Sequence, residues 1–179
     1  MPEPLHPAVV HFPVVLAVLL PVVAIGVFIA IRRGVSPRSW LVVVAMGGAL
    51  ALSSWVAVET GEEQEEVVEV VVPEGALEKH EEAGEALLVT SGVLFLLLAA
   101  GMAPGRVGSA LRAVSSVASL ALVLLAYNVG RSGGELVYEH GAAQAYVKNA
   151  SSGVSGAKGE RERHEVPSDD DGRDVREGH

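Results

Sequence analysis

The chain has 179 residues, enough for one domain, and half of them are apolar while only 4% are aromatic. This balance, tilted towards Val, Leu and Ala, is typical of helices that face lipid. The thirteen Lys and Arg are outnumbered by twenty-two acids, the formal net charge is -9, and no basic patch forms, which excludes a nucleic-acid partner. The absence of Cys excludes disulfides, thiolate metal sites and covalently attached c-type haem.

Four apolar blocks follow one another along the chain. They cover residues 12–31, 40–58, 86–102 and 113–129. Crossing about 30 Å of hydrocarbon takes about 20 apolar residues, and these blocks are apolar all round, whereas a soluble bundle would show polar faces with a period near 3.6. We therefore predict an all-α fold, a four-helix transmembrane bundle. Pro21 is expected to bend the first helix, and residues 1–11 lack the basic start of a signal peptide.

The remaining segments are polar. Residues 62–72 are rich in Glu and Val, and they either extend the second span as a helix or form a short strand. Residues 133–150 mix apolar and charged side chains, which predicts a short outward-facing helix at the membrane interface. The Gly, Ser and charge-rich residues beyond 150 are expected to be disordered. The predicted organisation is a membrane domain over residues 1–150 and an outward-facing polar tail over residues 151–179.

Basic residues are distributed unevenly between the loops. Arg32, Arg33 and Arg38 follow the first span, and Arg106 and Arg112 lie between the third and fourth, whereas the acidic loop 59–82 holds only Lys79. The positive-inside rule then places both arginine loops in the cytoplasm and both termini outside.

This topology brings chemistry-bearing side chains to the outward face. Four histidines and two carboxylates lie at the outer ends of the four spans: His6, His11, His80, His140, Glu59 and Glu81. Imidazoles from different helices can ligate a transition-metal ion, with carboxylates as ligands or orienting partners. We expect His11, His80 and His140 to bind a cofactor and all six residues to be candidate metal ligands.

A simpler interpretation is that each histidine is a polar residue at a membrane boundary. No short ligand motif is present, and the five-residue spacing of His6 and His11 separates them by about 140° on a regular helix. They would then face different partners, unless Pro7 and Pro13 break the helix there.

Several motifs resemble a known bacterial family of four-helix proteins, described as predicted membrane proteins of unknown function. The motifs are Leu5-His6-Pro7-Ala8-Val9-Val10-His11-Phe12-Pro13, Thr60-Gly61, His80-Glu81-x-x-Gly84, and Gly133-Gly134-Glu135-Leu136-Val137-Tyr138-Glu139-His140-Gly141. The resemblance covers roughly residues 5–145 and implies the fold derived above. It also implies a location in the inner membrane of a bacterium, with the arginine loops in the cytoplasm and both termini outside. Some members are fused to cytochrome c or Rieske-type domains, which by analogy implies redox work.

Three functions are consistent with these features. The first is binding of b-type haem in electron transfer, with His11 and His80 or His80 and His140 as axial ligands and a periplasmic electron carrier as partner. The second is a non-haem metal site of the same histidines with Glu59 or Glu81. The third is a cofactor-free membrane scaffold or interaction subunit. No nucleophile and base stand at a catalytic spacing, so we expect no stand-alone enzyme.

Overall fold

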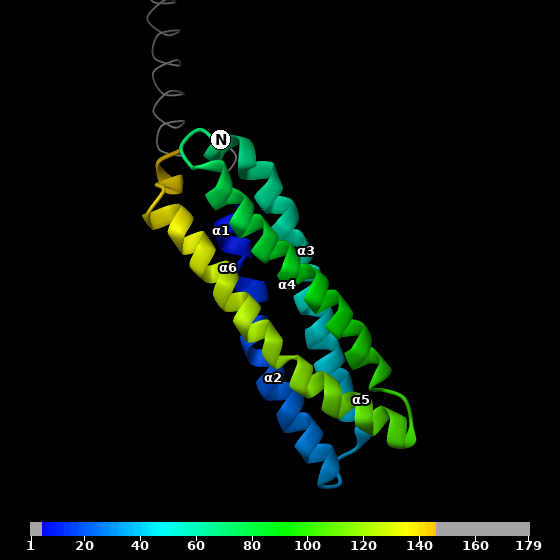
Figure 1. Cartoon of the computed structure of the whole chain (residues 1–179). Coiled ribbons are helices and arrows are strands. Elements are labelled where there is room, and N and C mark those ends of the chain that lie inside the picture. The colour runs from blue at the N-terminus through cyan, green and yellow to red at the C-terminus, as the bar shows by residue number, and fades with distance from the viewer. Residues whose placement is uncertain (1–4, 146–179) are drawn as a thin grey trace, which may run out of the picture. The chain divides into compact units, whose positions relative to one another are not determined.

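A computed structural model describes residues 5–145, and every regular element within them is a helix (Figure 1). The elements are α1 (His6–Val9), α2 (His11–Arg32), the 3₁₀ helix η1 (Pro37–Ser39), α3 (Trp40–Val68), α4 (Glu74–Ala100), α5 (Gly105–Ala118) and α6 (Leu120–Tyr138). Four stretches are long and apolar enough to cross a bilayer: His6–Arg32, Pro37–Glu66, Glu74–Ala100 and Gly105–Tyr138. The predicted four-helix transmembrane fold is confirmed.

The helices form a closed ring in which each span packs on two others. Helix α3 lies between α2 and α4, while α5 and α6 together make the fourth side and pack on both α2 and α4. Successive spans run in opposite directions, so the α3–α4 connection lies at the same end as the start of α1 and the end of α6 (Figure 1). Segments far apart in the sequence, such as α1 and the end of α6, therefore lie at the same end of the bundle.

Most side chains inside the ring are apolar, with several buried serines among them. The outer faces of the spans are also apolar, but they are exposed. Leu20, Leu50 and Leu98 are fully buried in the core. At most 33% of the most apolar 18-residue window of any span is buried, and the exposed outer residues include Val22 and Leu124. Outside a membrane such a surface would be an aggregation site, so it indicates contact with lipid.

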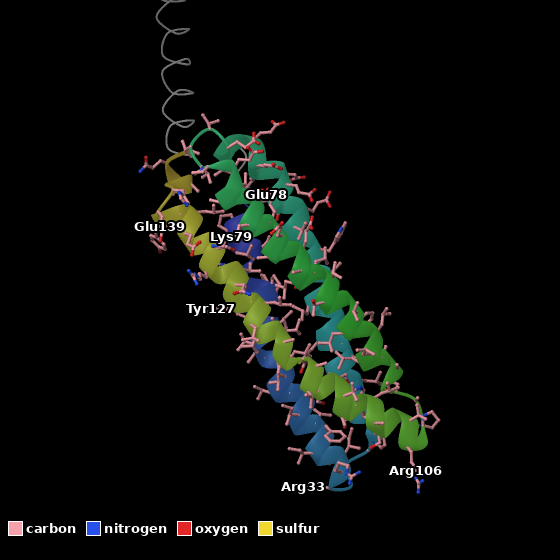
Figure 2. All side chains as sticks on the ribbon, viewed as in Figure 1. Arg33, Glu78, Lys79, Arg106, Tyr127 and Glu139 are labelled. Atoms are coloured by element: carbon pink, nitrogen blue, oxygen red, sulfur yellow. The ribbon has the colours of Figure 1, made fainter. Side chains whose placement is uncertain are left out.

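The two ends of the bundle carry opposite charges (Figure 2). All acidic residues between 5 and 145 lie in 59–85 or at Glu135 and Glu139, at the end where the described chain begins and finishes. We call this the acidic end. The opposite end, here called the arginine end, carries Arg32, Arg33, Arg38, Arg106 and Arg112. Figure 2 shows Glu78 and Glu139 at one end and Arg33 and Arg106 at the other.

A tight turn closes α2 at the arginine end. Gly34 has a φ of 105°, which only glycine adopts without strain. Its N–H donates to the carbonyl of Ile31, and the N–H of Val35 donates to that of Ala30, both at 3.1 Å. These two bonds form a Schellman motif, which satisfies carbonyls left free at the helix end.

Several helix boundaries differ from those expected. Helix α3 continues to Val68, so the first alternative for residues 62–72 holds up to that residue and no strand forms there. Helix α4 begins at Glu74, well before the apolar block that starts near residue 86. The fourth span is divided at Ser119, and α6 continues through Gly133 and Gly134 to Tyr138. The predicted ends mark where the apolar sequence stops, while the helices continue through polar residues.

The predicted interfacial helix lies only in part within the described residues. Residues 133–138 belong to α6, and a helix resumes at 142 after Gly141, which has a φ of 69°. Ala142 packs with Val72, Leu77 and Leu136 in a small apolar cluster at the acidic end. The rest of that prediction, and the predicted disordered tail over 151–179, fall outside the described residues.

Candidate functional site

His6 lies at the acidic end, on the short helix α1, which packs against α3. Its Nδ1 atom is 2.8 Å from the carbonyl oxygen of Ala57 and 3.4 Å from Oγ1 of Thr60. Because a carbonyl oxygen only accepts, Nδ1 carries the proton, and in the neutral ring Nε2 is left with a free lone pair. The Thr60 hydroxyl in turn donates to the carbonyl of Val56 at 2.8 Å.

His80 lies on the first part of α4 and is held in the same way by α6. Its Nδ1 atom is 2.9 Å from Oγ of Ser132. The Ser132 hydroxyl donates to the carbonyl of Val129 at 3.2 Å, so the serine oxygen accepts from His80. This ring, too, uses Nδ1–H to bind the protein and leaves Nε2 available.

Two glycines provide the space for these rings. A Cβ atom at Gly61 would lie 3.1 Å from Cε1 of His6, and one at Gly133 would lie 3.1 Å from Cε1 of His80. Both distances are shorter than ordinary van der Waals contacts, so a side chain at either position would crowd the imidazole. Gly61 comes directly after Thr60, whose hydroxyl lies near His6, and Gly133 comes directly after Ser132, whose hydroxyl binds His80. Each histidine is therefore bordered by the glycine that follows its hydroxyl neighbour.

The two imidazoles lie close together, one from α1 and one from α4. Their ring centroids are 6.1 Å apart and their planes are nearly perpendicular, at 88°. Both side chains are partly buried. Within residues 5–145 neither Nε2 atom has a hydrogen-bond partner. The site thus presents two oriented nitrogen lone pairs from α1 and α4, and we call it the histidine pair.

A polar groove adjoins the histidine pair between α4 and α6. It encloses about 440 Å³ and is lined by Lys79, Glu82, Ala83, Ala86, Leu125, Asn128, Arg131 and Ser132. At its margin Glu135 accepts from Lys79 and from Arg131, each at 2.8 Å. All three side chains reach solvent, so these ion pairs contribute little to the stability of the fold. Their main effect is to hold the three side chains in place at the margin of the groove. Ser132 belongs both to the groove and to the support of His80.

The other predicted site residues lie around the histidine pair without joining it. His11 is exposed at the start of α2, and His140 is half-buried just after α6. Glu59 is exposed on α3, whereas Glu81 on α4 is half-buried and lies in the field of other carboxylates, including Glu62 and Glu65. In the part of the chain that the structure describes, no three His, Cys, Asp or Glu side chains are grouped so that they could hold a metal ion.

A family model described as "Predicted membrane protein (DUF2231)" matches residues 2–145. The chain belongs to this family. No curated protein matches it, and no solved structure does. The DUF2231 match includes both members of the histidine pair and the groove, and it supports the assignment of this chain as a multi-pass membrane protein.

Five residues around the histidine pair were not among those predicted to bind a cofactor or metal. They hold or border the two imidazoles, and they are Ala57, Thr60, Gly61, Ser132 and Gly133. Gly61 and Gly133 stand in the motifs that carry the family resemblance, next to Thr60 and Ser132. A hydroxyl residue followed by glycine near the acidic end of a span is the sequence signal that would have pointed to both glycines.

Proposed function

We propose that this DUF2231 protein binds a b-type haem through His6 and His80 at its acidic end and takes part in electron transfer. The observation that carries the proposal is the histidine pair. Two imidazoles on different helices are each held through Nδ1–H, with Nε2 free, and their centroids are 6.1 Å apart. Histidines that ligate metals commonly donate the other ring N–H to a carbonyl or a similar acceptor, which fixes the tautomer.

The spacing of the rings is compatible with shared ligation of one iron. Two nitrogens about 2 Å from a metal are about 4 Å apart, and with each centroid about 1 Å further back the centroids are about 6 Å apart. The observed 6.1 Å agrees with this value. Perpendicular ring planes do not prevent such ligation, because each ring binds along its own nitrogen axis.

The number of ligands favours haem over a bare metal ion. Structural zinc sites use four protein ligands and catalytic sites three, whereas the porphyrin itself occupies the equatorial positions of haem iron. His6 and His80 are two, and within residues 5–145 no third His, Cys, Asp or Glu is grouped with them. A non-haem ion at this pair would need ligands from water or a partner.

The chain's own residues would set the properties of such a centre. Bound haem iron exchanges one electron. Ala57 and Ser132 would orient the two rings, and the carboxylates of the acidic end would favour the more positive state of the centre. The same carboxylates would attract a basic electron carrier outside the membrane. The orientation behind this last step, with the arginine end in the cytoplasm of a bacterial inner membrane, rests on the positive-inside rule.

A cofactor-free scaffold is the second candidate, and a specific observation favours it. His6 joins α1 to α3, and His80 joins α4 to α6, so the two side chains already connect elements of all four spans. In this interpretation the histidines stabilise the acidic end and do no chemistry. The two candidates differ in what happens to bound cofactor when a histidine is removed.

The test is the visible spectrum of the protein, purified in mild detergent from haem-replete cells and recorded oxidised and reduced. We expect a Soret band and a reduced α-band, and we expect His6→Ala and His80→Ala each to lower haem content at least about tenfold. His11→Ala and His140→Ala are the matched controls, because these side chains lie outside the pair, and both should retain the spectrum. Circular dichroism of each variant verifies that the helices remain.

Two results would contradict the haem proposal. Wild-type protein without a Soret band, even after addition of haem to the purified sample, would favour the scaffold. Equal loss of haem in all four variants would show that no particular pair ligates the iron. Elemental analysis of haem-free samples separates a bound transition metal from the scaffold.

A further inference from the structure

Arg112 on α5 is buried at the arginine end without a partner. Its residue surface is 6% exposed, and its Nε atom is buried and makes no hydrogen bond. Within the described residues the side chain has neither an ion pair nor a hydrogen bond. Burying a charge is costly unless it is paired, so the guanidinium calls for an anion that the described chain does not supply.

The position of Arg112 is built by close packing. A Cβ atom at Gly101 would lie 3.1 Å from Cγ of Arg112 and 2.8 Å from Nε1 of Trp40, so only glycine leaves room for both side chains. Trp40 is fully buried and donates from Nε1 to the carbonyl of Leu98 at 2.9 Å. The aliphatic part of Arg112 is thus fixed between α5 and the end of α4.

No acidic residue of the described chain lies near this end. The segments 5–58 and 86–134 contain no Asp or Glu, and the last described residues, 139–145, lie at the acidic end. Five arginines of the described chain therefore share the arginine end without a carboxylate, and Figure 2 labels two of them, Arg33 and Arg106. The missing anion must come from outside the described chain.

The surroundings favour lipid as its source. Helix α5 exposes Val107, Val114 and Val117 on its outer face, so it borders the acyl region of the bilayer. The arginine end lies where the spans leave the hydrocarbon, which is the depth of lipid phosphates. Guanidinium binds phosphate through two parallel N–H···O bonds, and surplus basic residues at a membrane surface attract anionic lipids.

We propose that Arg112 binds the phosphate of an anionic phospholipid from the leaflet at the arginine end. The lipid supplies the counter-charge that the fold lacks, and its acyl chains lie along α5. Arg32, Arg33, Arg38 and Arg106 add the long-range attraction that selects anionic over zwitterionic lipid. This site is at the opposite end from the histidine pair and does not depend on haem binding.

The first test measures retained lipid by native mass spectrometry, after incubation in a maltoside detergent with equal amounts of phosphatidylglycerol and phosphatidylcholine. We expect wild-type protein to retain phosphatidylglycerol preferentially and Arg112→Gln to bind it at least about tenfold more weakly, as expected for losing a charge-assisted hydrogen-bonded pair. Arg106→Gln is the matched control. It removes an exposed arginine of the same helix, and its binding should change less than about threefold.

The second test measures thermal unfolding and remains informative if lipid is lost in the spectrometer. In lipid-depleted detergent the guanidinium has no partner, so Arg112→Gln should unfold at the same temperature as wild type or higher. Addition of phosphatidylglycerol should raise the wild-type midpoint above that of Arg112→Gln, because a ligand stabilises the state that binds it.

Specific outcomes overturn the proposal. If Arg112→Gln is less stable than wild type in lipid-depleted detergent, Arg112 has a partner within the protein. If the variant retains phosphatidylglycerol as well as wild type does, lipid is not the ligand. A co-purifying polypeptide that only Arg112→Gln releases would identify an acidic subunit instead. If Arg112→Gln loses phosphatidylglycerol and phosphatidylcholine to the same extent, the site has no preference for anionic headgroups.

Discussion

At the scale of single residues, replacing Gly133 and Gly134 by Ala tests how closely the imidazole of His80 is held. Both are interior positions of α6, so replacement by Ala gives each the same gain in helix propensity, about 1 kcal/mol. The Cβ at Gly133 would crowd His80 at 3.1 Å, while nothing lies within 4 Å of one at Gly134. We expect Gly133→Ala to be about 1–2 kcal/mol less stable than Gly134→Ala, measured by unfolding in detergent. Equal stabilities would mean that His80 is not confined there.

The sequence indicated which end of the bundle holds the histidines but not which of them meet. His6 and His11 diverge as their five-residue spacing on a helix predicts, because Val10, between α1 and α2, keeps helical backbone angles, with φ -59° and ψ -22°. His6 therefore lies against α3, while His11 is exposed. The partner atoms, a carbonyl and a hydroxyl more than fifty residues away, depend on packing that residue spacing does not encode.

At the scale of elements, α3 and α4 approach each other closely at Gly47. A Cβ there would lie 2.6 Å from Cδ1 of Leu98, whereas one at Gly92, on α4, would meet nothing within 4 Å. Small residues let membrane helices approach in this way. Gly47→Val should therefore lower the free energy of unfolding by about 2 kcal/mol relative to Gly92→Val, which changes propensity equally. Unfolding in mixed detergent measures the difference, and equal values would show that Leu98 moves aside freely.

Hydropathy predicted the spans well and the full helices poorly, for a physical reason. The apolar blocks record contact with lipid, but α3 and α4 continue into water as charged helices that pack on each other. Two helix starts are not detected by hydropathy. They are marked by Pro73, at the N-cap position of α4, and by Gly105, the first residue of α5, which has a φ of 71°. The division at Ser119 follows serines that bond to carbonyls in the preceding turn, a contact that bends helices.

At the scale of the whole molecule, the charge asymmetry between the two ends predicts a single orientation in the membrane. The natural chain has no Cys, so one introduced thiol is the only site for a maleimide. Val35, in the first arginine loop, and Tyr138, at the end of α6, are 48% and 89% exposed. In intact bacteria a membrane-impermeant maleimide should label Tyr138→Cys and not Val35→Cys, because the arginine loops stay in the cytoplasm. After permeabilisation both variants should be labelled, which controls for reactivity. The reverse pattern in intact cells would place the histidine pair in the cytoplasm and exclude an external electron carrier as its partner.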